Sequence, residues 1–122
     1  MSRVLLVDDD ESQRVSLGVL LEDEGFAVDV SVSLGEARRV LGAPAAAYDL
    51  LVLDQHLGDG LGSALVPLVR ERLPRAAVVL VTGSVEEREL TAAAADAIIL
   101  KGTPFPDLLA ILQRALAVAA RR

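Results

Sequence analysis

The chain has 122 residues, the length of one ordinary domain, and a chain of this size buries roughly two-thirds of its unfolded surface. Hydrophobic residues make up 52% of it but aromatic residues only 2%, so we expect one core of aliphatic side chains. The lack of cysteine excludes disulfides and thiolate metal sites, and a formal net charge of −6 disfavours direct binding to nucleic acid or anionic lipid. No signal-peptide pattern and no apolar run of roughly 18 residues is found, so we expect a cytoplasmic protein with no membrane contact.

Short apolar runs alternate with amphipathic segments along the chain, and this alternation predicts βα units and a parallel sheet. The first unit has a strand at Val4–Val7 and a helix at Glu11–Glu24. The second has a strand at Ala27–Val32 and a short helix that ends near Leu41. The order of these elements predicts an α/β fold.

Three further units complete the chain. The third has a buried strand at Leu50–Leu53, a glycine-rich stretch and a helix at Ser63–Leu73, in which Pro67 has to lie within or near the first turn. The last two have strands at Ala77–Val81 and Ala97–Leu100, followed by helices at Ser84–Ala95 and Pro106–Ala119. We see no linker and no second domain.

Helix starts and helix faces can also be predicted. Three starts have a capping residue with a polar partner three positions on: Asp10 with Gln13, Ser33 with Glu36, and Ser84 with Glu87. Leucines at helical spacing are expected to face the core in the first and last helices: Leu17, Leu20 and Leu21, then Leu109, Leu112 and Leu116.

Four of the strands end in polar side chains. Acidic residues follow the first, and Asp54, Thr82 and Lys101 follow the third, fourth and fifth. Taken singly, each is more often a turn, cap or solvated surface residue than a functional one. Because the carboxyl ends of parallel strands meet at one edge of a sheet, the four together predict a site there.

The residue types limit what such a site can do. Asp8, Asp9 and Asp54 would repel one another, which raises carboxyl pKa values unless a cation holds the groups ionised. Oxygen ligands of this charge suit Mg²⁺ or Mn²⁺. Lys101 and the Thr82 hydroxyl can bind an anion, so the set suits phosphoryl transfer with a carboxylate as the nucleophile.

Four motifs in this order cover essentially the whole chain: Arg3-Val-Leu-Leu-Val-Asp8-Asp9-Asp10, Leu51-Val-Leu-Asp54 with Leu57 and the glycines behind it, Val79-Leu-Val-Thr82-Gly83, and Ile98-Ile-Leu-Lys101. In this order and spacing, the sequence resembles the receiver domain of two-component response regulators. The resemblance implies a single receiver domain over residues 1–122, without an output domain in this chain. It also implies a flavodoxin-like (βα)5 doubly wound sheet with strand order 2-1-3-4-5.

The resemblance further implies the chemistry. Asp54 would accept a phosphoryl group from the phosphohistidine of a sensor histidine kinase or a histidine phosphotransfer protein. Mg²⁺ (or Mn²⁺) would be bound by Asp9, Asp54 and the backbone carbonyl of His56, with Asp8 nearby through water. Thr82 and Lys101 would hold the phosphoryl oxygens.

The family relays the signal through the face formed by the fourth helix, fifth strand and last helix to a downstream output domain or protein, and a homodimer is compatible with it. Here the switch residues would be Thr82 and Ile98, although the family often has an aromatic at the second position. Gly102 follows the lysine where the family usually has proline, and Gly58 replaces another common proline. For the side chain of His56, the simpler interpretation is a loop residue; a role in dephosphorylation is a hypothesis that His56→Ala would test.

Three other classes of protein share part of this pattern. A flavodoxin-type cofactor binder shares the fold, but acids after the first strand would repel its phosphate. A haloacid-dehalogenase-like phosphatase needs a second acid at the position of His56. A receiver that acts as an interaction module without phosphorylation is the remaining alternative, and the complete set of site residues argues against it.

Overall fold

The structure is a computed structural model that describes residues 2–84 and 95–122. Its centre is a five-stranded sheet made of β1 (Arg3–Val7), β2 (Ala27–Ser31), β3 (Leu50–Asp54), β6 (Ala77–Thr82) and β7 (Ala97–Leu100). All neighbouring strands are parallel, in the order β2-β1-β3-β6-β7. Counted along the chain, these main strands have the predicted order 2-1-3-4-5, so the flavodoxin-like fold is confirmed.

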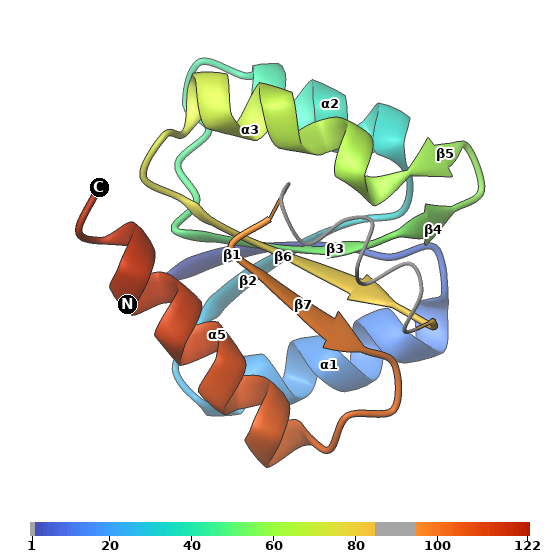
Figure 1. Ribbon diagram of the computed structural model, residues 1–122. Coiled ribbons are helices and arrows are strands. Elements are labelled where there is room, and N and C mark those ends of the chain that lie inside the picture. Colours follow the sequence, from blue (N-terminus) through green and yellow to red (C-terminus); the bar gives the residue numbers. More distant parts are fainter. Residues whose placement is uncertain (1, 85–94) are drawn as a thin grey trace.

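Helices cover both faces of the sheet (Figure 1). On one face lie α2 (Leu34–Gly42) and α3 (Val66–Arg72), and on the other lie α1 (Glu11–Asp23) and α5 (Phe105–Ala119). The helix predicted between Ser84 and Ala95 falls on residues 85–94, outside the described residues. No helix among the residues described has both the length and the hydropathy that crossing a bilayer requires.

Alternation along the strands divides the core into two clusters. In β1, Leu5 and Val7 pack in the cluster under α2 and α3, whereas Val4 and Leu6 pack in the cluster against α1 and α5. Every residue of β3 is buried, as expected for a central strand covered on both faces. Each such aliphatic side chain contributes about 1.5–3 kcal/mol by its burial, and together they hold the strand ends in fixed positions.

The predicted caps of the first two helices are found. The Asp10 side chain accepts a hydrogen bond from the Gln13 N–H at 3.1 Å, and the Ser33 Oγ accepts one from the Glu36 N–H at 3.1 Å. Helix α1 ends just before Gly25, whose N–H donates to the Glu22 carbonyl. These caps satisfy backbone N–H groups that a helix start leaves without partners.

The third unit differs from the prediction. The segment between Asp54 and α3 contains a small antiparallel hairpin of β4 (His56–Leu57) and β5 (Gly60–Leu61), where a loop was expected. The predicted helix from Ser63 begins instead as a 3-10 turn, η1 (Gly62–Leu65), before α3. Pro67 lies in the first turn of α3, where its missing N–H is tolerated.

Two predicted helix faces were partly wrong. Leu20 is 41% exposed, so among the predicted leucines of α1 only Leu21 is fully buried and Leu17 packs at the edge of its cluster. In α5, Leu109 is only half-buried, and the buried residues are Leu108, Leu112, Ala115 and Ala119. In α5 the reason is that alanines form part of the buried stripe, which a search for leucines alone overlooks.

Candidate active site

The strand ends meet at one edge of the sheet as predicted. The register pairs Val7 of β1 with Leu53 of β3, so Asp8 and Asp54 follow directly on neighbouring strands. On the other side of β3, Asp54 pairs with Val81, next to Thr82. The Lys101 N–H donates to the Thr82 carbonyl at 2.8 Å, which extends the ladder between β6 and β7 beyond the last strand pair.

Three carboxylates gather at this edge. Asp8, Asp9 and Asp54 each offer a carboxylate oxygen, and these oxygens lie within 4.8 Å of one another. Asp8 and Asp54 are buried, whereas Asp9 is exposed. The Lys101 Nζ lies 3.3 Å from the Asp54 Oδ2. Among the described residues, the three carboxylates carry more charge than this lysine neutralises, so the cluster favours a further cation.

Both oxygens of the Asp54 carboxylate have partners. Oδ1 accepts a hydrogen bond from the backbone N–H of His56 at 3.1 Å, and Oδ2 accepts one from Lys101. Only 3% of the Asp54 side chain is exposed, against 36% for Lys101. The acid is therefore fixed in orientation, while the lysine reaches it from the solvent side.

Asp8 shows the electrostatic strain of the site. Burial raises the pKa of its carboxyl group, and the charges of Asp54 and Asp9 raise it further, against a hydrogen bond from the Asp10 N–H at 2.9 Å that lowers it. The predicted direction is confirmed for this residue, although burial contributes more than charge repulsion. A divalent cation would relieve both effects, and an all-oxygen set of carboxylates fits Mg²⁺ or Mn²⁺.

The segment after Asp54 is fastened by contacts that the sequence did not reveal. Gln55 is buried, and its Nε2 donates to the Ser63 Oγ at 3.0 Å while the Ser63 N–H donates to the Gln55 Oε1 at 2.9 Å. A Cβ on Gly62 would lie 2.2 Å from the Asp54 carbonyl oxygen, so only glycine fits there. Such a reciprocal pair has no local sequence pattern, so the sequence did not predict it.

The other switch candidates are also placed. Thr82 is fully buried at the end of β6. Its Oγ1 accepts a hydrogen bond from the backbone N–H of Ser84 at 3.5 Å. Ile98 is partly buried in β7 and packs against the core cluster under α2 and α3. It therefore occupies a core-edge position, and its movement would have to displace packed side chains.

The turn after the lysine explains one departure from the family. Gly102 has φ +89°, a conformation that proline cannot adopt because its ring fixes φ near −65°. The Thr103 hydroxyl donates to the Leu100 carbonyl at 2.6 Å and closes the turn. Gly102 therefore forms a turn whose backbone conformation excludes proline at this position.

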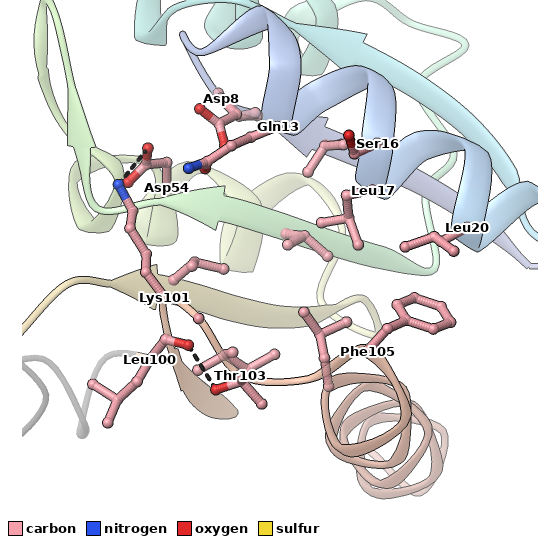
Figure 2. A pocket seen from close by; sticks show the side chains of 17 residues that line it. Asp8, Gln13, Ser16, Leu17, Leu20, Asp54, Leu100, Lys101, Thr103 and Phe105 are labelled. Atoms are coloured by element: carbon pink, nitrogen blue, oxygen red, sulfur yellow. Dashed lines mark hydrogen bonds and ion pairs between the residues drawn. The ribbon is translucent and has the colours of Figure 1, made fainter.

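A cavity of about 290 Å³ opens beside Asp54, and residues of α1 and α5 line it. Figure 2 shows Lys101 reaching Asp54 at one end, with Leu17, Leu20 and Phe105 lining the other. Its walls are mostly apolar. An apolar wall lowers the local dielectric and strengthens the interaction of Asp54 with cations.

Comparisons with known proteins agree with this geometry. The family model of the response regulator receiver domain matches residues 4–113. The photosynthetic apparatus regulatory protein RegA of Cereibacter sphaeroides is 38% identical over 80 residues, covering 66% of this chain and 42% of RegA. The matched region is thus less than half of that relative's length.

Two solved structures extend the agreement to the fold. A CheY-like receiver domain protein from Methanospirillum hungatei has a TM-score of 0.87 and 29% identity, over 99% of this chain and 98% of that one. The response regulator TrrA from Thermotoga maritima, solved in complex with Mg²⁺ and BeF, has a TM-score of 0.83 and 27% identity, over 94% and 99% of the two chains. Because the family model spans most of the chain, including the acidic edge and all of the five-stranded sheet except Arg3, this chain belongs to the response regulator receiver domain family.

Proposed function

We propose that this chain is the phosphoacceptor of a two-component system and that Asp54 is the residue phosphorylated. The observation that carries the proposal is the buried Asp54 carboxylate, which lies between Lys101 at 3.3 Å and the carboxylates of Asp8 and Asp9. A fixed carboxylate beside an acidic cluster and a lysine suits attack on phosphorus better than it suits a structural role.

The proposed transfer takes the phosphoryl group from a phosphohistidine of a partner kinase or phosphotransfer protein. A carboxylate oxygen of Asp54 forms a bond to phosphorus as the phosphorus–nitrogen bond breaks, and the bonding electrons return to the imidazole nitrogen of the partner. Asp8, Asp9, Asp54 and the His56 carbonyl would hold Mg²⁺ or Mn²⁺. When bound, the ion neutralises the negative charge that develops on the phosphoryl oxygens.

Lys101 and Thr82 are proposed to hold the product. A phosphoryl group adds nearly two negative charges at pH 7. Lys101, now paired with the Asp54 carboxylate, would pair with a phosphoryl oxygen, and the Thr82 hydroxyl would donate to another. Thr82 is the last residue of β6 and Lys101 directly follows β7, so we expect their movement to pull on the segments that come after these strands.

The signal would leave through the face that contains β7 and α5. The third part of this face would be the helix predicted at Ser84–Ala95. Ile98 lies in β7 at the edge of the core, and we propose that it repacks in place of the family's aromatic switch residue. The receiving partner would be an output domain or protein, since the formal charge of −6 disfavours nucleic acid as a direct partner.

The test is phosphorylation by acetyl phosphate in the presence of Mg²⁺, followed by intact mass and by mapping of the modified residue. Wild-type protein should gain one phosphoryl group at Asp54, and Asp54→Asn or added EDTA should abolish the gain. Asp23→Asn, which changes an exposed acid at the end of α1, is the matched control and should behave as wild type. If Asp54 stays unmodified while the chain still binds a partner, the protein is instead an interaction module that works without phosphorylation.

A further inference from the structure

The tip of the β4–β5 hairpin is joined to the start of α2. Asp59 lies in the turn, and its two carboxylate oxygens accept hydrogen bonds from the N–H groups of Leu34 at 2.9 Å and Gly35 at 3.0 Å. These hydrogen bonds lower the pKa of Asp59, so it is ionised at neutral pH. Asp59 therefore caps the first turn of α2, although it lies 25 residues after Leu34 and 24 after Gly35 in the sequence.

A second contact holds the same two segments together. Gly60 has φ +149°, and a Cβ on it would lie 2.6 Å from the Cδ1 of Leu34. Leu34 is itself 5% exposed, with its side chain in the core cluster under α2 and α3. The tip therefore lies directly against a buried residue of the helix start.

The opposite side of the hairpin lies against the acidic cluster. A Cβ on Gly58 would be 3.8 Å from the Oδ2 of Asp9. At the base, the Gly62 N–H donates to the Gln55 carbonyl at 2.9 Å, and the His56 N–H contacts Asp54. The hairpin is thus a short hydrogen-bonded segment that lies between the candidate metal site and α2.

The start of α2 depends on the hairpin for part of its hydrogen bonding. Ser33 satisfies the N–H of Glu36 through its hydroxyl and that of Ala37 through its carbonyl, but Leu34 and Gly35 rely on Asp59. Any displacement of the hairpin would therefore weaken two of these bonds. The dependence is mutual, since Asp59 also fixes the hairpin.

We propose that Asp59 is a positioning residue that couples cation binding at the acidic cluster to the first turn of α2. The proposal rests on the proposed function, because it assumes that Mg²⁺ binds beside Asp9 and Asp54. Asp59 would act through the hairpin, which contains His56 and adjoins Asp9, and not as a ligand. Because coupling between sites is reciprocal, Mg²⁺ should in turn stabilise the start of α2.

The test compares Mg²⁺ binding by isothermal titration calorimetry in wild type, Asp59→Ala, Asp59→Asn and Ser33→Ala. Asp59→Ala should raise the Kd about tenfold, the lower end of what removal of an outer supporting group does to a metal site. Asp59→Asn keeps one carbonyl acceptor, so its Kd for Mg²⁺ should lie between those of wild type and Asp59→Ala. Ser33→Ala removes a cap from the same helix turn but leaves the hairpin contacts in place, so its Kd should rise less than that of Asp59→Ala.

Amide hydrogen exchange supplies a readout that does not depend on activity. In wild type, Mg²⁺ should slow exchange at Leu34 and Gly35, and in Asp59→Ala this effect should disappear. If wild type binds Mg²⁺ and Asp59→Ala binds it equally well, or if Ser33→Ala weakens binding as much, the coupling is wrong while the proposed function stands. If wild type binds no Mg²⁺, both are wrong.

Discussion

Asp8 is a site residue whose buried negative charge lowers the stability of the metal-free fold. Asp8 as a residue is 8% exposed, and two further acids lie near its carboxyl group. Its folded pKa therefore lies above the ordinary value of 3.8. The folded chain holds this proton more tightly than the unfolded chain, so the metal-free protein loses stability as pH rises from 3.8 through the raised pKa.

We therefore expect Asp8→Asn to raise the urea midpoint of the metal-free protein at pH 7. The amide is neutral, and its oxygen can still accept the hydrogen bond from the Asp10 N–H. The difference from wild type should disappear at pH values below 3.8. In Mg²⁺ the order should reverse, because bound ion at about 100 times its Kd adds roughly 2.7 kcal/mol to wild type and little to the variant.

Urea denaturation in EDTA and in Mg²⁺ at several pH values checks both halves of this expectation. A lower midpoint for Asp8→Asn in EDTA at pH 7 would show that Asp8 has a structural role that outweighs its buried charge. Asp23→Asn controls for the loss of one negative charge, since Asp23 is exposed and remote from the acidic cluster.

At the scale of elements, strands and strand ends could be predicted better than helix faces. Runs such as Leu50–Leu53 are continuous and aliphatic, so both the strand and the placement of Asp54 at its end follow from the sequence. The parallel sheet then brings Asp8, Asp54 and Lys101 together without further information. The strands that short apolar runs predict are therefore the same strands that position the site residues.

The missed features depend on contacts between distant segments. Strands of two residues, β4 and β5, have no periodicity to detect, and the Gly58-Asp59 pair that forms the turn was the only local sign of a hairpin. The bonds of Asp59 to α2 and of Gln55 to Ser63 join segments by side chains that are common in loops. The positions of these side chains in the sequence do not distinguish them from polar residues that are exposed to solvent.

The face of α5 gives a test of the corrected register. Leu112 is fully buried against the sheet, whereas Leu109, three residues earlier, is only half-buried. Leu112→Ala should lower the free energy of unfolding by about 2–5 kcal/mol, because it removes buried surface and leaves a cavity. Leu109→Ala should lower it by less than about 1.5 kcal/mol, since part of that side chain is already in water.

Denaturant unfolding of the two variants, with CD as the signal, measures the difference directly. Both substitutions are leucine to alanine in the same helix, so helix propensity cancels between them. Equal losses of stability would contradict the buried stripe of Leu108, Leu112, Ala115 and Ala119.

For the molecule as a whole, β7 is held by charge pairs at both ends. After its carboxyl end, Lys101 pairs with Asp54 in the site. Before its start, Asp96 accepts two hydrogen bonds from Arg122 at 2.6 and 3.0 Å, one from the Val78 N–H at 2.7 Å, and one from Arg70 at 3.2 Å. This cluster joins α3, β6, β7 and the segment after α5, and so fixes the end of the edge strand away from the site.

The Asp96 cluster gives the fold a predictable dependence on acid. Burial alone would raise the pKa of Asp96, but the hydrogen bonds from Arg122, Val78 and Arg70 outweigh it and lower the pKa to about 2. A carboxyl whose folded pKa lies below its ordinary value of 3.8 stabilises the fold above that pH, and the stabilisation is lost as pH falls toward 2. The shift corresponds to at most about 2 kcal/mol at neutral pH, since the arginines are partly exposed.

We expect Asp96→Asn to be less stable than wild type by up to about 2 kcal/mol at pH 7, because the amide keeps an acceptor but loses the charge that both arginines contact. The difference should shrink as pH falls from 4 to 2, because the wild-type carboxyl takes up a proton over this range and becomes neutral like the amide. Urea unfolding at pH 7, 4, 3 and 2 measures this convergence. A difference that stays constant over this range would mean that hydrogen-bond geometry, and not the charge of Asp96, holds the start of β7 in place.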